Sequence, residues 1–198
     1  MKKVICIGDS IRMGYEPTVV EELAGWAEVV ALKDRQCGST RVILEHLDEW
    51  LSDDLDVVHI NAGLHDMAQD PTPDPEVPPT GESQVPLGEY RANLDRILKR
   101  IASTTQAQIV VGLTTPVDLR RQHASGKGIH RTNQNVAAYN DVASEVATQH
   151  GVVIDDLHSV VVDNGPALML NEDGVHFTDE GSASLGRAVA SAIRRVAS

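Results

Sequence analysis

The sequence has few aromatic residues and an excess of negative charge. Its 198 residues include two Trp, three Tyr and one Phe, and 17 Lys and Arg stand against 29 Asp and Glu, which gives a formal net charge of −12. Phosphate backbones require a positive surface, and unpaired bases stack on aromatic rings. The composition therefore argues against a nucleic-acid partner.

Cysteines and long apolar runs are equally scarce. Cys6 and Cys37 are the only cysteines; they make no disulfide framework and fit no zinc spacing, so we expect both to be small buried hydrophobic residues. No segment is long enough to span a membrane, and the N-terminal apolar segment is too short for a signal peptide. We therefore expect a single domain over residues 1–198, no membrane partner and a cytoplasmic location.

Strand-like and helix-like segments alternate along the chain. Short apolar runs predict strands within residues 4–7, 27–32, 55–63, 107–116 and 152–154. Helical patterns cover residues 17–27, 39–51, 87–103, 132–151 and a last segment from about residue 178. Pro17 is expected in the first turn of the first helix. This alternation predicts an α/β protein with a five-stranded parallel sheet between two helical layers, a three-layer α/β/α architecture.

Two segments depart from this pattern. Residues 69–86 are rich in proline, which excludes a helix interior and a central strand, so they are predicted to form an extended surface loop. Residues 118–131 are predicted to be a basic loop after the fourth strand. They contain Arg120, Arg121 and Arg131 together with two histidines. This loop is interpreted either as a binding site for an acidic sugar or a phosphate-bearing substrate, or as ordinary solvated surface.

Polar residues follow the predicted strands. In parallel sheets, ligands bind beyond the C-terminal ends of the strands. Ser10 follows the first strand, Gly38 the second, and the segment from Asn61 to Asp66 the third. All are expected to converge on one edge of the sheet.

Two distant motifs together suggest nucleophilic catalysis. Gly8, Asp9 and Ser10 end the first strand, whereas Asp173 and His176 lie three residues apart just before the last helix. A serine hydroxyl becomes a good nucleophile when an imidazole removes its proton, and a carboxylate fixes the tautomer of that imidazole. Each motif alone is weak, because Gly, Asp and Ser are also common in turns. Their combination favours a Ser-His-Asp triad.

The sequence resembles the SGNH or GDSL hydrolases in four blocks that follow the family's order. GDSI at residues 8–11 corresponds to G-D-S-L, and RQCGST at 35–40 supplies the glycine block. NAGLHD at 61–66 occupies the place of G-x-N-D, and DGVHFTDEG at 173–181 matches the D-x-x-H block. The resemblance covers nearly the whole chain. It implies a flavodoxin-like fold and a serine esterase that needs no cofactor and no metal.

The resemblance also implies a role for each matching residue. Ser10 would be the nucleophile, His176 the general base and then acid, and Asp173 the residue that orients His176. The backbone amides of Ser10 and Gly38 would donate to the oxyanion. The third donor differs, because His65 stands where the family has asparagine. A neutral imidazole retains one N–H and can donate, so His65 is favoured, with Asn61 as the alternative.

The substrate is predicted only as a class. A small-molecule ester is expected, and the few aromatics and the missing apolar lid favour short acyl groups, acetyl on a carbohydrate above others. Lysophospholipase or thioesterase activity is the alternative within the family. Two further alternatives are a non-catalytic carbohydrate-binding module and a metal site made of His65, Asp66, Asp173 and His176, although the metal site would leave Ser10 and Gly38 unexplained. Nothing in the sequence predicts the oligomeric state.

Overall fold

The computed structural model describes residues 1–32, 38–74, 77–126 and 128–197. Their centre is a five-stranded sheet in the order β2-β1-β3-β4-β5, and every neighbouring pair is parallel. The strands are β1 (Lys2–Gly8), β2 (Ala27–Val30), β3 (Val57–Asn61), β4 (Gln108–Gly112) and β5 (Val153–Asp155). The predicted parallel sheet is confirmed.

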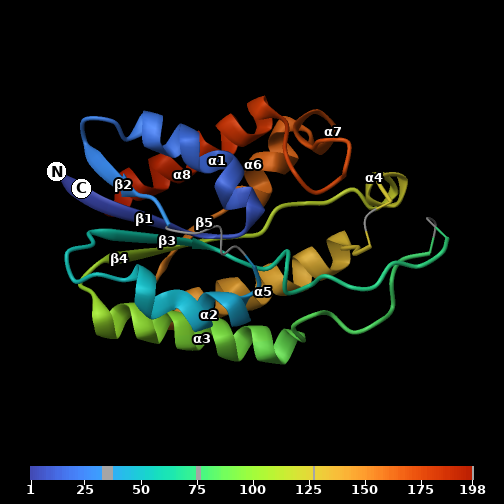
Figure 1. The fold of residues 1–198 in the computed structure, drawn as a ribbon, viewed down its shortest axis with the longest axis horizontal. Helices are drawn as coiled ribbons and strands as arrows, with labels where there is room; N and C mark the ends of the chain where they lie inside the picture. The colour runs from blue at the N-terminus through green and yellow to red at the C-terminus, as the bar shows by residue number, and fades with distance from the viewer. Residues whose placement is uncertain (33–37, 75–76, 127, 198) are drawn as a thin grey trace.

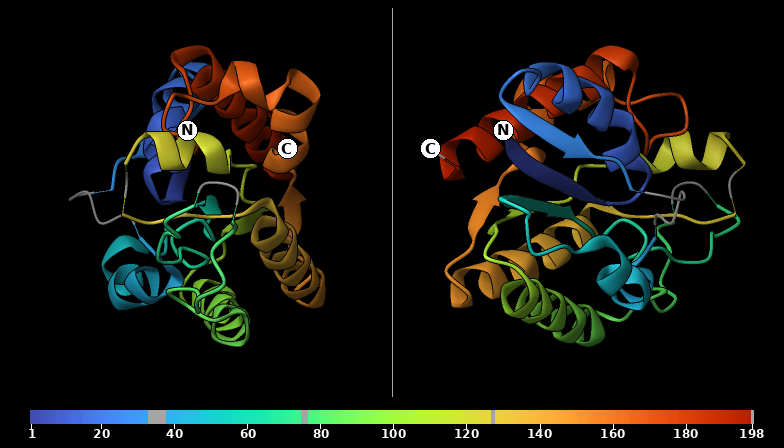
Figure 2. Two further views of the ribbon diagram at one scale, coloured as in Figure 1. Left: turned by 90° about the vertical axis from the view of Figure 1, so that its right-hand side faces the viewer. Right: turned by 60° about the vertical axis from the view of Figure 1, so that its left-hand side comes forward.

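Helices cover both faces of the sheet (Figures 1 and 2). One face carries α1 (Ser10–Glu22), α6 (Leu157–Asn164), α7 (Pro166–Met169) and α8 (Asp179–Val196). The other face carries α2 (Thr40–Trp50), α3 (Leu87–Thr104) and α5 (Asn133–Gln149). The short helix α4 (Leu119–Ala124) lies beyond the C-terminal edge of the sheet. Among the described residues, no helix combines the length and the apolar character needed to cross a bilayer.

The central strands have helices on both sides, which explains their continuous apolar runs. All five residues of β3 are buried, and so are the last five residues of β1. His59 in β3 is fully buried, and its Nε2 is 3.1 Å from Oδ2 of Asp155. This histidine belongs to the interior of the sheet and does not reach its C-terminal edge.

The first helix begins earlier than Pro17 suggested. α1 begins at Ser10, with Asp9 as its N-cap, and the carboxylate of Asp9 accepts the N–H of Ile11 at 2.9 Å. Pro17 therefore lies inside the helix, and the prediction for this proline is wrong. A proline in the interior removes one helical hydrogen bond. The helix tolerates this loss because buried side chains on both sides of Pro17, among them Tyr15 and Val19, pack into the core.

The two segments predicted as loops differ from each other. The described residues of 69–86 form no helix, and Gln69 alone makes an isolated bridge, to His130. The basic segment 118–131 is only partly a loop, because it contains α4. The carboxylate of Asp118 caps this helix by accepting the N–H of Arg121 at 3.0 Å. That local cap is the physical reason why this part of the loop prediction is wrong.

Candidate active site

Three side chains from opposite ends of the chain meet at the C-terminal edge of the sheet. Oγ of Ser10, the first residue of α1, lies 2.8 Å from Nε2 of His176. Nδ1 of the same ring lies 2.6 Å from Oδ2 of Asp173. These contacts form one hydrogen-bonded chain from hydroxyl to imidazole to carboxylate, which we call the candidate triad.

A sharp turn from β1 into α1 presents Ser10. A Cβ atom on Gly8 would lie 2.7 Å from the carbonyl oxygen of Asn61 and 2.9 Å from Cβ of Arg12, so this position has no room for a side chain. The next residue, Asp9, is almost completely buried, and burial raises the pKa of its carboxyl group. The glycine and the capping aspartate of the Gly-Asp-Ser motif therefore shape the turn that exposes the serine.

The loop between α7 and α8 fixes Asp173 and His176 relative to each other. Oδ1 of Asp173 accepts the N–H groups of Val175 at 3.0 Å and His176 at 2.9 Å, so its other oxygen is turned toward the imidazole ring. The carbonyl of Gly174 accepts the N–H of Asp118, next to α4, at 2.8 Å. The three-residue spacing of Asp173 and His176 therefore brings the two side chains together because backbone N–H groups of the same loop donate to the Asp173 carboxylate.

Two backbone donors lie at the starts of helices. Within the described part of the chain, neither the N–H of Ser10 nor that of Gly38 donates to a protein acceptor. Gly38 comes just before α2, whose first residue, Thr40, donates its N–H and its hydroxyl to Asp66 at 3.0 and 2.5 Å. Burial raises the pKa of Asp66 to about 6. Asp66 therefore links the glycine block to the third block of the sequence.

The two sequence candidates for a third donor occupy different places. His65 is partly buried beside Ser10 and His176, and burial lowers its pKa, which keeps the imidazole neutral with one N–H to donate. Asn61 is 3% exposed, and its amide nitrogen donates to the carbonyls of Gly112 at 3.1 Å and Leu113 at 3.4 Å. The position of His65 suits a ligand contact, whereas the Asn61 amide connects β3 to the end of β4.

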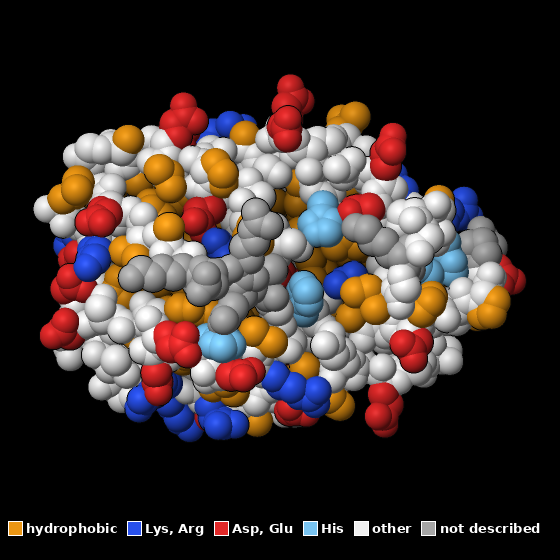
Figure 3. All heavy atoms as spheres, in the orientation of Figure 1, with side chains coloured by type: hydrophobic (Ala, Val, Ile, Leu, Met, Phe, Trp, Pro, Cys, Tyr) orange, Lys and Arg blue, Asp and Glu red, His pale blue; other side chains and the backbone are white. Residues whose placement is uncertain are grey.

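A small hollow, the active-site pocket, opens at the candidate triad. Its volume is about 230 Å³, below the roughly 300–1,000 Å³ of typical ligand pockets. In Figure 3, histidine and basic side chains border hydrophobic surface in a hollow of the visible face. The lining residues are Asp9, Ser10, Leu64, His65, Ile129, Arg131, Val175 and His176.

The sequence motifs did not identify all of the residues that line this pocket. Leu64 and Val175 lie inside recognised blocks, and only their neighbours were singled out. Ile129 and Arg131 come from the basic segment 118–131. The three arginines of this segment were the sequence feature that could have indicated a place in the pocket wall. No described residue of the proline-rich segment 69–86 lines the pocket.

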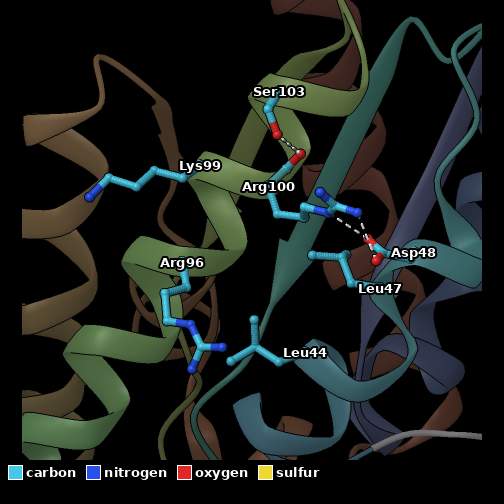
Figure 4. Close-up of a pocket in the computed structure, with 7 residues that line it drawn as sticks. All are labelled: Leu44, Leu47, Asp48, Arg96, Lys99, Arg100 and Ser103. Carbon is cyan, nitrogen blue, oxygen red and sulfur yellow. Dashed lines mark hydrogen bonds and ion pairs between the residues drawn. The ribbon is translucent and has the colours of Figure 1, made fainter.

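A second hollow lies between α2 and α3 (Figure 4). Its volume is about 480 Å³, and it is lined by Leu44, Leu47, Asp48, Arg96, Lys99, Arg100 and Ser103. Arg100 reaches across to Asp48, with Nε 2.6 Å from Oδ1, while Lys99 points away. This hollow contains a surface ion pair, and the hydroxyl of Ser103 in its wall donates to the backbone carbonyl of Arg100 at 3.0 Å rather than to a base. The smaller pocket is therefore the better candidate for chemistry.

The alternative metal site does not match the observed contacts. Asp66 directs its carboxylate to Thr40, and Asp173 directs its carboxylate to His176. In the described ranges, no group of three or more His, Cys, Asp or Glu side chains is arranged to hold a metal ion. Cys6 is buried, and burial raises the pKa of its thiol to about 12, as expected for a structural cysteine. Cys37 lies outside the described residues.

Serine, histidine and aspartate joined by hydrogen bonds at the edge of a parallel sheet are the arrangement of a serine hydrolase. The model of the GDSL-like Lipase/Acylhydrolase family matches residues 6–183. The chain belongs to this family and is an SGNH-type carboxylic ester hydrolase. No protein with a curated description matches the sequence significantly.

Solved structures share the fold. The lipase/acylhydrolase from Enterococcus faecalis superposes with a TM-score of 0.77 at 23% identity, covering 98% of this chain and 96% of the other. Axe2, an acetylxylan esterase from Geobacillus stearothermophilus, gives 0.73 at 20% identity, covering 97% and 94%. The acetyl xylan esterase AlAXEase gives 0.72 at 17% identity, covering 96% and 99%. At these identities the likeness shows the fold alone.

Proposed function

We propose that the chain is a serine esterase that removes short acyl groups, acetyl above others, from a carbohydrate or another small alcohol. The observation that carries this proposal is the hydrogen-bonded chain of Ser10, His176 and Asp173 at the wall of a small pocket. The proposal excludes a cofactor from the reaction cycle, because the three side chains supply the nucleophile, the base and the orienting carboxylate.

In the proposed mechanism, Oγ of Ser10 attacks the acyl carbonyl while Nε2 of His176 takes its proton. The oxyanion accepts hydrogen bonds from the N–H groups of Ser10 and Gly38 and from His65. His176 then protonates the leaving alcohol, which gives an acyl-serine. Water, deprotonated by His176, attacks this ester, and the serine leaves with the returned proton. Asp173 stabilises the imidazolium that forms in both halves of the cycle.

The dimensions of the pocket support a short acyl group. A volume of about 230 Å³ accommodates an acetyl group and part of an alcohol, but a long acyl chain would extend into solvent. Two of the structures with this fold are described as acetylxylan esterases, which adds support for an acetylated carbohydrate. A lysophospholipase or thioesterase would need a longer apolar channel beside Ser10.

Hydrolysis of p-nitrophenyl esters from acetyl to octanoyl, with wild type and Ser10→Ala, tests the proposal. We expect turnover that is highest on the acetate and that is lost in the variant. A maximum at longer chains would keep the mechanism but overturn the short-acyl substrate. Equal activity in both proteins would overturn Ser10 as the nucleophile.

Chelator treatment and a binding measurement distinguish the other classes of function. A metal-dependent enzyme would lose activity on treatment with a chelator, whereas the serine mechanism predicts no change. A binding module would retain an acetylated oligosaccharide without releasing acetate, and Ser10→Ala would leave that binding intact.

A further inference from the structure

Arg131 is a buried cation in the wall of the active-site pocket. Its side chain shares the pocket with Ser10 and His176, yet the residue is only 5% exposed. Nε donates to the carbonyl of Leu64 at 2.5 Å. Its backbone is held from both sides by Gln122, whose Oε1 accepts the N–H at 2.9 Å and whose Nε2 donates to the carbonyl at 3.0 Å. Arg131 is therefore fixed in place before any ligand arrives.

Arg131 makes no direct ion pair with the part of the chain that the structure describes. Burying a cation without a partner is costly, and buried charges are usually paired. Burial lowers the pKa of Arg131, and Asp9 and Asp173 act in the opposite direction from a longer range. Among the residues that the structure describes, no carboxylate lies within ion-pair distance of this guanidinium, and Nη1 and Nη2 have no acceptor. As far as the described residues go, both terminal nitrogens remain available to a ligand in the pocket.

The other basic residues in the described part of this segment do not share this position. Arg121 uses Nη1 and Nη2 to hold the carbonyls of Leu170 at 2.8 Å and Ala167 at 3.1 Å. The rings of His123 and His130 pack edge to face, with centroids 4.0 Å apart, and neither ring lines the pocket. Of the basic residues in the described part of this segment, Arg131 is the one in the pocket wall.

We propose that Arg131 binds a carboxylate on the alcohol part of the ester substrate. A guanidinium with two unused terminal nitrogens matches a carboxylate in the bidentate geometry that arginine favours. This inference rests on the proposed function. A short acyl group has no oxygen besides its reacting carbonyl, so the anionic acceptor must belong to the alcohol. The substrate class is an O-acylated hydroxy acid, of which an acetylated acidic sugar is one example.

The test compares esters that differ in one charge. 3- and 4-acetoxybenzoate carry the carboxylate on the alcohol part, and the matching acetoxybenzamides are neutral and of nearly the same shape. The ratio of kcat/KM for acid over amide is measured in wild type, Arg131→Lys and Arg131→Met. Arg96→Met removes an exposed arginine from the hollow between α2 and α3 and serves as the control for net charge.

We expect wild type to favour at least one of the two acids over its amide. Arg131→Met should lower that ratio by about tenfold or more, the size expected for a lost charge-assisted hydrogen bond. Arg131→Lys should retain part of the preference, and Arg96→Met should retain all of it. Intrinsic differences in leaving-group reactivity cancel, because each variant is compared with wild type on the same pair of esters.

Two other outcomes would overturn carboxylate binding by Arg131 without contradicting the proposed esterase function. A wild type that shows no preference for either acid, or an Arg131→Met variant that slows all esters equally, would contradict carboxylate binding by Arg131. If wild type hydrolyses no ester at all, including p-nitrophenyl acetate, the proposed function fails. Calorimetric binding of 3- and 4-hydroxybenzoate to wild type and Arg131→Lys then decides on the anion site, because absent or unchanged binding would refute it.

Discussion

Gly174 lies in the loop that carries Asp173 and His176, so its backbone geometry bears on the proposed mechanism. It lies two residues before His176, its φ is +71°, and a Cβ atom added to it would be 2.3 Å from the carbonyl oxygen of Asp118. To reach 3.0 Å, a separation below which real Cβ contacts are essentially never found, the two segments must move apart by about 0.7 Å. Gly174→Ala therefore changes the position of the loop as well as its backbone strain.

The expected effect on activity follows from that displacement. The hydrogen bond from Ser10 to His176 is 2.8 Å long, so a shift of about 0.7 Å passed to the imidazole would stretch it to about 3.5 Å. A misplacement of about 1 Å costs roughly 10²-fold in rate. We expect Gly174→Ala to lower kcat on p-nitrophenyl acetate by about 10- to 100-fold, with a smaller change in KM.

Gly151→Ala provides a matched control. Gly151 also has a positive φ, +65°, but a Cβ atom added there would meet nothing within 4 Å, so alanine introduces only the left-handed backbone cost of about 1–2 kcal/mol. Thermal denaturation and ester kinetics of both variants separate strain from displacement. If Gly174→Ala loses stability like Gly151→Ala but keeps the wild-type kcat, the loop does not position His176 in the way we describe.

Three further predictions concern the candidate site. Asp173→Asn should lower kcat by roughly 10⁴-fold while KM changes little, as measured on p-nitrophenyl acetate, because the carboxylate that fixes the imidazole tautomer is lost. His65→Ala should lower kcat by about 10²–10³-fold if His65 is an oxyanion donor, whereas Asn61→Ala should mainly lower the melting temperature; kinetics and melting curves of both variants distinguish the two residues. The pKa of Asp66 is raised from 3.8 to about 6, so between these values the native state binds more protons than the unfolded state, and stability falls as pH rises. Urea denaturation from pH 4 to pH 7 should show wild type losing up to about 3 kcal/mol relative to Asp66→Asn, and parallel pH profiles would contradict this assignment.

The sheet was predictable because its central strands are apolar on both faces. β1 and β3 appear in the sequence as continuous apolar runs, and their burial explains why. The short helices α4, α6 and α7 were not predicted, since four to eight residues give too little periodicity to recognise. Pro17 was misleading because tertiary packing of α1 outweighed the preference of proline for a first turn.

The candidate site could be predicted only where a residue of a suitable chemical type also stood at the end of a predicted strand or just before a predicted helix. The contacts among Ser10, His176 and Asp173 follow from motifs at the ends of elements that share one sheet edge. The place of Arg131 in the pocket depends on hydrogen bonds to Gln122 and Leu64, which no spacing in the sequence reveals. The strand register turns the Asn61 amide toward β4, and the sequence alone does not give that register.

The N-cap at Asp9 also makes the proposed oxyanion position favourable. The first N–H groups of a helix have no partner inside the helix, and its N-terminus carries partial positive charge. Asp9 satisfies Ile11 at the start of α1, and Asp66 satisfies Thr40 at the start of α2. These two carboxylates leave the N–H groups of Ser10 and Gly38 without a protein acceptor in the described chain. Negative charge that develops on a substrate oxygen would thus form where two helices begin, and the aspartates of the first and third blocks act there by binding the neighbouring amides.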